Sequence, residues 1–196
     1  MKVEQIYTGC LAQGAYYITS MGEAAIIDPL REITPYLERL KRDGVKLKYI
    51  LETHFHADFV SGHLDLSRAT GAPIVYGPTA KPGFDAIVAE DNQIFELGNV
   101  KIRVLHTPGH TMGGICIYNE ANRTVFTGDT LFLDDIGRTD LADGDGWLMR
   151  DTMVDIIDKW DNDIVIYPGH GDGGTMKKVR EINEEFKFAL TLPKKS

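Results

Sequence analysis

Short runs of apolar residues, separated by turn-forming residues, extend along most of the chain. Runs of this length that end at Gly, Pro, Asn or Asp are typical of β-strands. Gly98-Asn99, between two such runs, predicts a hairpin turn. The pattern predicts strands over residues 3–7, 16–19, 24–28, 48–51, 73–76, 93–97, 100–105, 114–118, 124–127 and 164–167.

Longer segments with apolar residues at helical spacing separate groups of these strands. They predict helices over residues 33–42, 63–69, 148–160 and 177–189. The first has clear signals at both ends, because Thr34-Pro35 is a favoured start and Asp43-Gly44 a favoured stop. Strands and helices thus occur in both halves, which favours a layered α/β sandwich formed by one domain over residues 1–196.

Composition narrows the class of protein. A hydrophobic fraction of 43% is sufficient for a core, and a net charge of −8 without an extended Lys/Arg block argues against nucleic acid or a membrane surface as partner. No apolar run approaches the ~18 residues of a membrane span, and the first residues lack the apolar core of a signal peptide. With two cysteines, Cys10 and Cys116, expected as free thiols, the sequence predicts a cytoplasmic protein.

Polar loops follow the carboxyl ends of four predicted strands. Ligands in sheet proteins gather at such ends, where a rigid strand supports the loop, and Gly and Pro beside several of these positions fix the backbone. The side chains that could bind a metal are His54, His56 and Asp58 after the fourth strand, then His110, Asp129 and His170 after later ones.

Any single histidine is more often structural than a ligand. Here, however, four of the six histidines fall at these loop positions together with two aspartates, and this combination predicts a metal site. His63 is expected to open a helix and His106 to orient a neighbour, so neither is expected to be a ligand.

The ordered motifs resemble those of the metallo-β-lactamase fold superfamily over nearly the whole chain. The resemblance implies an αββα four-layer sandwich with the metal site along one edge. In binuclear members, the positions of His54, His56 and His110 hold the first metal and that of Asp129 bridges the two. Asp58, His170 and a histidine at position 59 hold the second metal, but position 59 is Phe in this chain.

Phe59 has no lone pair to offer a metal. The first site keeps three imidazoles and a carboxylate, whereas the second keeps two carboxylates and one imidazole. We therefore expect one tightly bound metal and, at most, a weakly held second one.

The two halves of the chain resemble different branches of the superfamily. The first half, with Ala-Asp-Phe-Val-Ser-Gly-His after His56, is similar to the persulfide dioxygenases that are often fused to rhodanese. That resemblance implies one non-haem Fe(II) held by His54, His110 and Asp129, with His56 as a close neighbour. The second half, with Gly-Arg-Thr-Asp and Tyr-Pro-Gly-His-Gly, resembles the small glyoxalase-II-like hydrolases.

Two activities on a small thiol-derived substrate follow from these resemblances. We favour a dioxygenase that oxidises glutathione persulfide with Fe(II) and O₂, and the alternative is a zinc-dependent hydrolase of a glutathione thioester. Arg138 is a candidate contact for an anionic substrate or a partner of Asp140 or Asp135, and Asp58 a candidate base or second-metal ligand. A non-catalytic metal protein is disfavoured because neither cysteine lies in a ligand motif. The thiol carrier, and whether the chain forms a homodimer, stay open.

Overall fold

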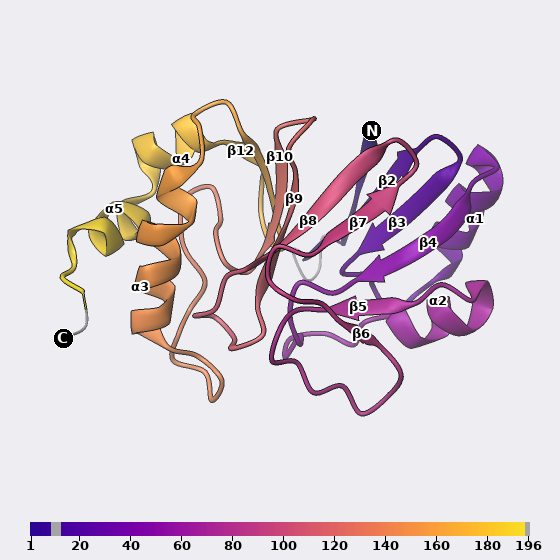
Figure 1. Cartoon of the computed structure of the whole chain (residues 1–196), viewed down its shortest axis with the longest axis horizontal. Coiled ribbons are helices and arrows are strands. Elements are labelled where there is room, and N and C mark those ends of the chain that lie inside the picture. Colours follow the sequence, from indigo (N-terminus) through magenta and orange to yellow (C-terminus); the bar gives the residue numbers. More distant parts are fainter. Residues whose placement is uncertain (9–12, 195–196) are drawn as a thin grey trace.

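Two six-stranded sheets lie between two layers of helices in the computed structural model, which describes residues 1–8 and 13–194 (Figure 1). The first sheet has the order β1-β2-β3-β4-β5-β6 and the second the order β12-β11-β10-β9-β8-β7. α1 and α2 cover the outer face of the first sheet, and α3, α4 and α5 lie beyond the second. The αββα sandwich implied by the sequence resemblance is thereby confirmed.

The strands agree closely with those predicted from the apolar runs. In the first sheet they are β1 (Lys2–Thr8), β2 (Gln13–Ser20), β3 (Glu23–Ile27), β4 (Lys46–Leu51), β5 (Ile74–Tyr76) and β6 (Ile87–Val88). In the second they are β7 (Ile94–Leu97), β8 (Val100–His106), β9 (Ile115–Asn119), β10 (Thr124–Gly128), β11 (Val165–Pro168) and β12 (Gly174–Thr175). Only the two-residue strands β6 and β12 were not predicted, because so short a segment carries no periodic signal.

Alternate residues of the central strands enter different cores. On β2, Tyr16 and Ile18 face the second sheet, whereas Ala15 and Tyr17 pack in the cluster that includes Tyr36 of α1. Because successive side chains of a strand point to opposite faces, a strand buried on both faces must be apolar throughout. A third cluster fills the space between the second sheet and its helices.

The helices are α1 (Thr34–Asp43), α2 (His63–Thr70), α3 (Gly146–Asp155), the 3₁₀ turn η1 (Ile157–Lys159), α4 (Met176–Ile182) and α5 (Glu184–Thr191). The single helices predicted over residues 148–160 and 177–189 were wrong, since each is interrupted. Ile156, with a φ of −119°, lies between the end of α3 and the start of η1. Asn183 ends α4 and caps α5 by accepting a hydrogen bond from Phe186 N, while its Nδ2 donates to the carbonyls of Phe132 and Asp135. These hydrogen bonds favour a break between α4 and α5. Helical periodicity cannot predict it, because the two carbonyls lie about 50 residues away in the sequence.

The hairpin predicted at Gly98-Asn99 joins β7 and β8. Gly98 has φ +57°, and a Cβ there would overlap the carbonyl oxygen of Ser20. The turn thus needs glycine both for its left-handed backbone and for its close approach to the end of β2.

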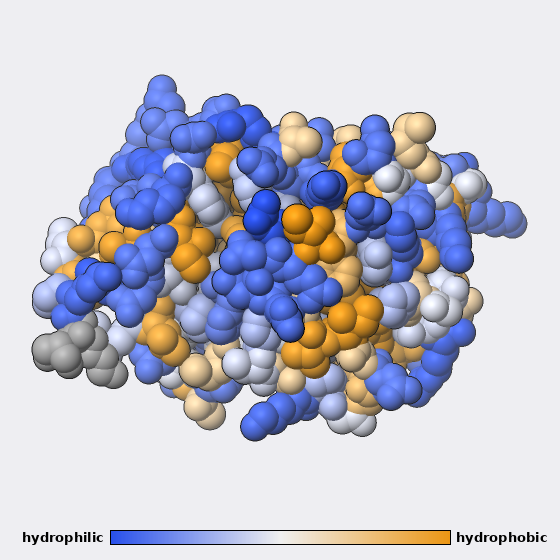
Figure 2. Space-filling model, in the orientation of Figure 1, coloured by the Kyte–Doolittle hydropathy of each residue, from blue (hydrophilic) through white to orange (hydrophobic). Residues whose placement is uncertain are grey.

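Three further expectations concern the polarity of the surface, membrane-spanning helices and the two cysteines. On the face shown in Figure 2, hydrophilic residues cover most of the surface and smaller hydrophobic areas interrupt them. Across residues 1–8 and 13–194, no helix combines the length and apolar character that crossing a bilayer requires. Cys116 is a buried free thiol as predicted, and Cys10 lies outside the described residues.

Candidate metal centre

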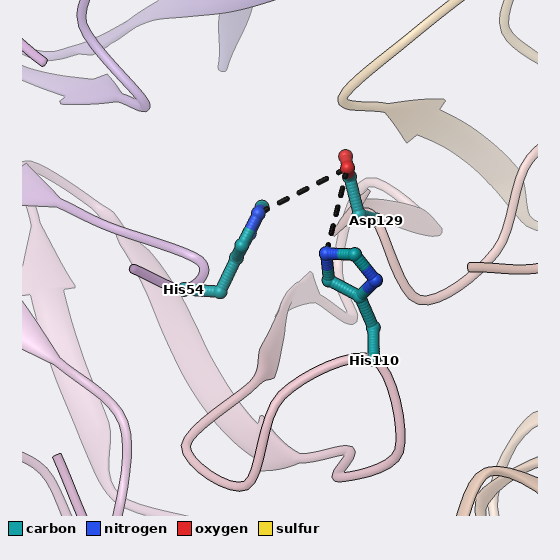
Figure 3. Close-up of side chains that lie close together, drawn as sticks. All are labelled: His54, His110 and Asp129. Carbon is teal, nitrogen blue, oxygen red and sulfur yellow. Dashed lines mark ion pairs between the residues drawn. The ribbon is translucent and has the colours of Figure 1, made fainter. Parts of the chain in front are cut away.

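Two histidines and one aspartate from distant loops converge at one end of the sandwich (Figure 3). His54 follows β4 of the first sheet, whereas His110 and Asp129 follow β8 and β10 of the second. His54 Nε2 lies 3.9 Å and His110 Nε2 3.8 Å from Asp129 Oδ2, and all three ligand atoms lie within 4.8 Å of one another. A single metal ion between them could therefore contact two imidazoles and one carboxylate.

Hydrogen bonds fix the ring of His54. Thr53 Oγ1 donates to Asp28 Oδ2 at 2.7 Å and lies 3.0 Å from His54 Nδ1. With its hydrogen committed to Asp28, Thr53 Oγ1 can only accept from Nδ1–H, which leaves the Nε2 lone pair facing Asp129. Burial lowers the pKa of His54 to about 3, so the imidazole is neutral and ready to bind a metal.

His110 is oriented in a similar way by a backbone group. Its Nδ1 lies 2.9 Å from the carbonyl oxygen of Arg138, which can only accept. The proton therefore resides on Nδ1, and Nε2 is again the nitrogen directed at Asp129.

Asp129 is the carboxylate of the group and is mostly buried. Burial opposes its ionisation, but His170, His54 and His110 together hold its pKa below the usual value. Its Oδ1 atom is buried without a hydrogen-bond partner among the described residues, an arrangement that is costly in the absence of a cation. This unsatisfied oxygen, beside the Nε2 atoms of two imidazoles, fits a metal ion as the missing partner.

Gly169 allows Asp129 to occupy this position. A Cβ at residue 169 would overlap Asp129 Oδ1, so only glycine permits the close approach. Gly169 N also donates to the carbonyl of Gly128 at 2.8 Å, which ties the loop after β11 to the end of β10.

His170 and Asp58 adjoin this group on one side. His170 Nε2 lies 3.4 Å from both Asp129 Oδ2 and Asp58 Oδ2. Both side chains are partly exposed, in contrast to His54. The sequence placed them together as ligands of a second metal, and the structure does bring them together next to Asp129.

His56 belongs to a different cluster. Its Nε2 lies 3.2 Å from both Asp28 Oδ1 and Glu52 Oε2, and these three residues form a second buried group of potential ligands. Burial opposes protonation of His56, but Asp28 and Glu52 raise its pKa above the ordinary value. Burial raises the pKa of the Glu52 carboxyl, because it disfavours the charged form. The Nε2 atom of His56 is thus engaged away from the group formed by His54, His110 and Asp129, and only Nδ1 remains for any metal.

Phe59 packs rather than binds. Its ring lies against that of His56, with centroids 4.3 Å apart, and it also contacts the cluster that includes Leu30 and Tyr36. Phe59, at the position where the sequence resemblance implies a ligand of a second metal, is therefore part of the apolar packing behind the loop.

A cavity of about 470 Å³ opens in front of the metal group, a size within the range of small-molecule sites. Arg138 borders it, but its guanidinium makes a bidentate ion pair with Asp140 at 2.7 and 2.8 Å. Of the two alternatives predicted for this arginine, the structure contains the pair with Asp140. The cavity is lined by His54, Ala57, Asp58, His110, Asp129, Phe132, Asp135, Ile136, Gly137, Arg138, Leu141 and His170.

The two remaining histidines lie outside the ligand group. His63 is the first residue of α2, and its Nδ1 lies 3.5 Å from Glu52 Oε1. His106 ends β8, and its Nε2 lies 2.9 Å from the carbonyl of Met112 in the loop that carries His110. Both positions agree with the supporting roles predicted for them.

Sequence reasoning did not identify Asp28 and Glu52 as part of the site. Asp28 accepts from Thr53 N at 2.7 Å as well as from its hydroxyl, and Glu52 accepts from Ser61 Oγ at 2.7 Å. Their one signal is local: each is an acidic residue at the end of an apolar strand, where burial requires a partner.

Comparisons with known proteins agree with this geometry. Residues 8–170 match the family described as the metallo-beta-lactamase superfamily. A probable hydroxyacylglutathione hydrolase of Schizosaccharomyces pombe is 37% identical over 153 residues, which cover 76% of this chain and 59% of that protein. The chain thus spans less than two thirds of that relative. The hydroxyacylglutathione hydrolase GloC of Haemophilus influenzae is 30% identical over 182 residues, covering 82% of this chain and 85% of the relative.

A solved structure supports the fold. The crystal structure of ETHE1 from Myxococcus xanthus superimposes with a TM-score of 0.89 and covers 98% of this chain and 92% of that one, at 23% sequence identity. The family match over most of the chain, the two sheets and the converging ligand loops lead to one conclusion: this chain belongs to the metallo-β-lactamase superfamily.

Proposed function

We propose that this chain is a persulfide dioxygenase that uses one Fe(II), held by His54, His110 and Asp129. The observation that carries the proposal is the composition of the ligand group: two imidazoles and one carboxylate, with the Nε2 atom of His56 engaged elsewhere. A site with two histidines and one carboxylate on one side of the metal leaves open positions and is characteristic of non-haem Fe(II) oxygenases. Phe59, which cannot bind a second metal, favours the same assignment.

The net reaction would take up O₂ and water and convert an organic persulfide, such as glutathione persulfide, into the thiol and sulfite with release of two protons. Bound Fe(II) would supply the redox chemistry. The protein would supply the imidazoles of His54 and His110 and the carboxylate of Asp129 as ligands. Asp58 Oδ2 and His170 Nε2, 3.4 Å apart at the cavity wall, could accept the released protons. The pairing of Arg138 with Asp140 favours a role in positioning the loop over contact with substrate.

A thioester hydrolase is the second candidate. Asp58, His170 and Asp129 lie together where binuclear relatives hold a second metal, and two of the most similar relatives are described as hydroxyacylglutathione hydrolases. In this reading a zinc ion would lower the pKa of a water toward ~7, and Asp58 would take its proton.

Substrate assays separate the two candidates. The dioxygenase proposal expects O₂ uptake and sulfite formation in equal amounts with glutathione persulfide, and little turnover of S-lactoylglutathione. Steady hydrolysis of S-lactoylglutathione, without O₂ uptake on the persulfide, would replace the proposal with the hydrolase.

A further inference from the structure

A second cavity, of about 500 Å³, adjoins the loop after β4 that carries His54, Asp58 and Phe59, here called the metal loop. Most of its walls are apolar side chains from β1, from the segment that leads into α1, and from the metal loop. Asp58 lines both this cavity and the one in front of the metal group, so the two adjoin each other at that residue. The apolar wall residues are Ile6, Tyr7, Leu30, Pro35, Phe59 and Val60.

Apolar side chains remain accessible in this cavity. Tyr7 is 51% and Val60 64% exposed, although most large apolar residues of the chain are buried. Exposed apolar surface next to a reactive centre is a feature of ligand-binding grooves.

Arg31 gives this groove its one cationic side chain, alongside the carboxylates of Glu32 and Asp58. Its guanidinium forms no ion pair or hydrogen bond with any residue in the ranges 1–8 and 13–194. The neighbouring Glu32 does not neutralise it through a direct pair, since Glu32 Oε1 accepts from both N and Oγ1 of Thr34. In the metal cavity, by contrast, the guanidinium of Arg138 is already paired with Asp140.

The walls of the groove are fixed relative to the metal loop. Leu30 and Ser61 form a β-bridge, and Gly62 N and Ser61 Oγ both donate to the carbonyl of Pro29 at 3.0 Å. Leu30 N donates to the hydroxyl of Tyr36 at 2.8 Å. A ligand in the groove would therefore lie at a constant position relative to Asp58, as a substrate subsite requires.

We propose that this groove, lined by Ile6, Tyr7, Leu30, Arg31, Phe59 and Val60, binds the carrier arm of the substrate. It fits an apolar chain that ends in a carboxylate or phosphate, with the anionic end at Arg31 and the sulfur at the metal group beyond Asp58. The groove should thus bind amphiphilic thiol carriers more tightly than glutathione, whose peptide backbone and charges find few partners on apolar walls, while glutathione persulfide is still a substrate. This inference rests on the proposed function, since it assigns the sulfur to the metal site.

Binding of thiols to the iron-loaded protein without O₂, measured by calorimetry, tests the groove. The probes are 8-mercaptooctanoate, 8-mercapto-1-octanol and glutathione, which share a sulfur and differ in the arm. Both eight-carbon probes should bind more tightly than glutathione, and the carboxylate should bind about two- to fivefold more tightly than the alcohol, as for a partly exposed ion pair. Glutathione binding at least as tight as that of 8-mercaptooctanoate, or equal affinity for the two eight-carbon probes, would overturn the assignment.

Three variants test whether the probes bind in this groove. Arg31→Gln should abolish the preference for the carboxylate and leave the affinity for 8-mercapto-1-octanol unchanged. Val60→Asp, at a largely exposed position, should weaken both eight-carbon probes. Arg68→Gln, which removes an exposed arginine paired with Asp65 on α2, is the matched control and should change neither affinity. A preference for the carboxylate that persists in Arg31→Gln contradicts the proposal. Failure of the dioxygenase proposal would appear separately, as probe binding without O₂ uptake on any persulfide.

Discussion

The ring of Phe59 lies against the ring of His56, with centroids 4.3 Å apart and planes inclined by 43°. His56 is held from the other side by Asp28 and Glu52 through its Nε2 atom. One face of the metal loop is thus built for packing and ion pairing, while the opposite face, with His54, carries the ligand group. This division favours the proposed single metal site in a loop that has the residues for more.

Restoring the missing ligand should restore a second site. Phe59→His is expected to raise the metal content of the purified protein from one toward two per chain, because Asp58, His170 and Asp129 already lie together. Phe55→His is the control. Phe55 lies in the same loop as Phe59, but its ring stacks on Tyr76 of β5 and not on the ligand group. Elemental analysis of both variants decides, and an unchanged content in Phe59→His would show that the second site lacks more than this ligand.

Gly169 should be required for tight metal binding, although it lies in a loop and offers no ligand atom. In Gly169→Ala the new Cβ overlaps Asp129 Oδ1, so the carboxylate must move. We expect metal affinity to fall by roughly ten- to a hundredfold, as for other changes that displace a ligand's support. Chelator competition measures this loss. Gly83→Ala, where a Cβ meets nothing within 4 Å, should be neutral, and equal effects in the two variants would refute the argument.

Glu52 should be essential for stability. Removing one partner of a buried ion pair leaves the other charge uncompensated and typically costs about 3–5 kcal/mol. Glu52→Ala is therefore expected to lower the free energy of unfolding in urea by an amount in that range. Glu23→Ala, which removes the partly exposed partner of Lys48, should lower it far less. Similar losses in the two variants would mean that Asp28 alone supports His56.

The Cys116 thiol should make the free energy of unfolding fall as the pH becomes alkaline. Burial raises the pKa of its thiol to about 12, against about 8.5 in an unfolded chain. A raised pKa means that the unfolded state ionises first, so stability present below pH 8.5 is lost as the pH rises toward 12. Between pH 8 and 10 the wild type should lose about 2 kcal/mol more than Cys116→Ala, in which this group is absent. Parallel losses, measured by urea unfolding, would show that the thiol ionises in the folded protein.

Most of the fold could be predicted because its signal is local. β2 and β3 contain uninterrupted apolar runs over residues 15–18 and 24–27, as strands covered on both faces require, and Thr34-Pro35 and Asp43-Gly44 mark the two ends of α1. The break at Asn183 could not be predicted, because the carbonyls that its side chain contacts belong to residues 132 and 135. Helical periodicity describes one segment and contains no information on such distant partners.

The ligand group illustrates the same limit. His54, His110 and Asp129 could be identified because each follows a strand and matches a family motif. The position of His56 depends on Asp28, which follows β3, and the tautomer of His110 depends on a backbone carbonyl of residue 138 that every residue type would provide. Which nitrogen of each histidine faces the metal is therefore a property of the fold rather than of the motif.

The metal content of protein purified without added metal tests the central claim most directly. The account predicts one iron per chain, lost on substitution of His54, His110 or Asp129 by Ala. Two zinc ions per chain, with Asp58 and His170 needed for the second, would contradict it.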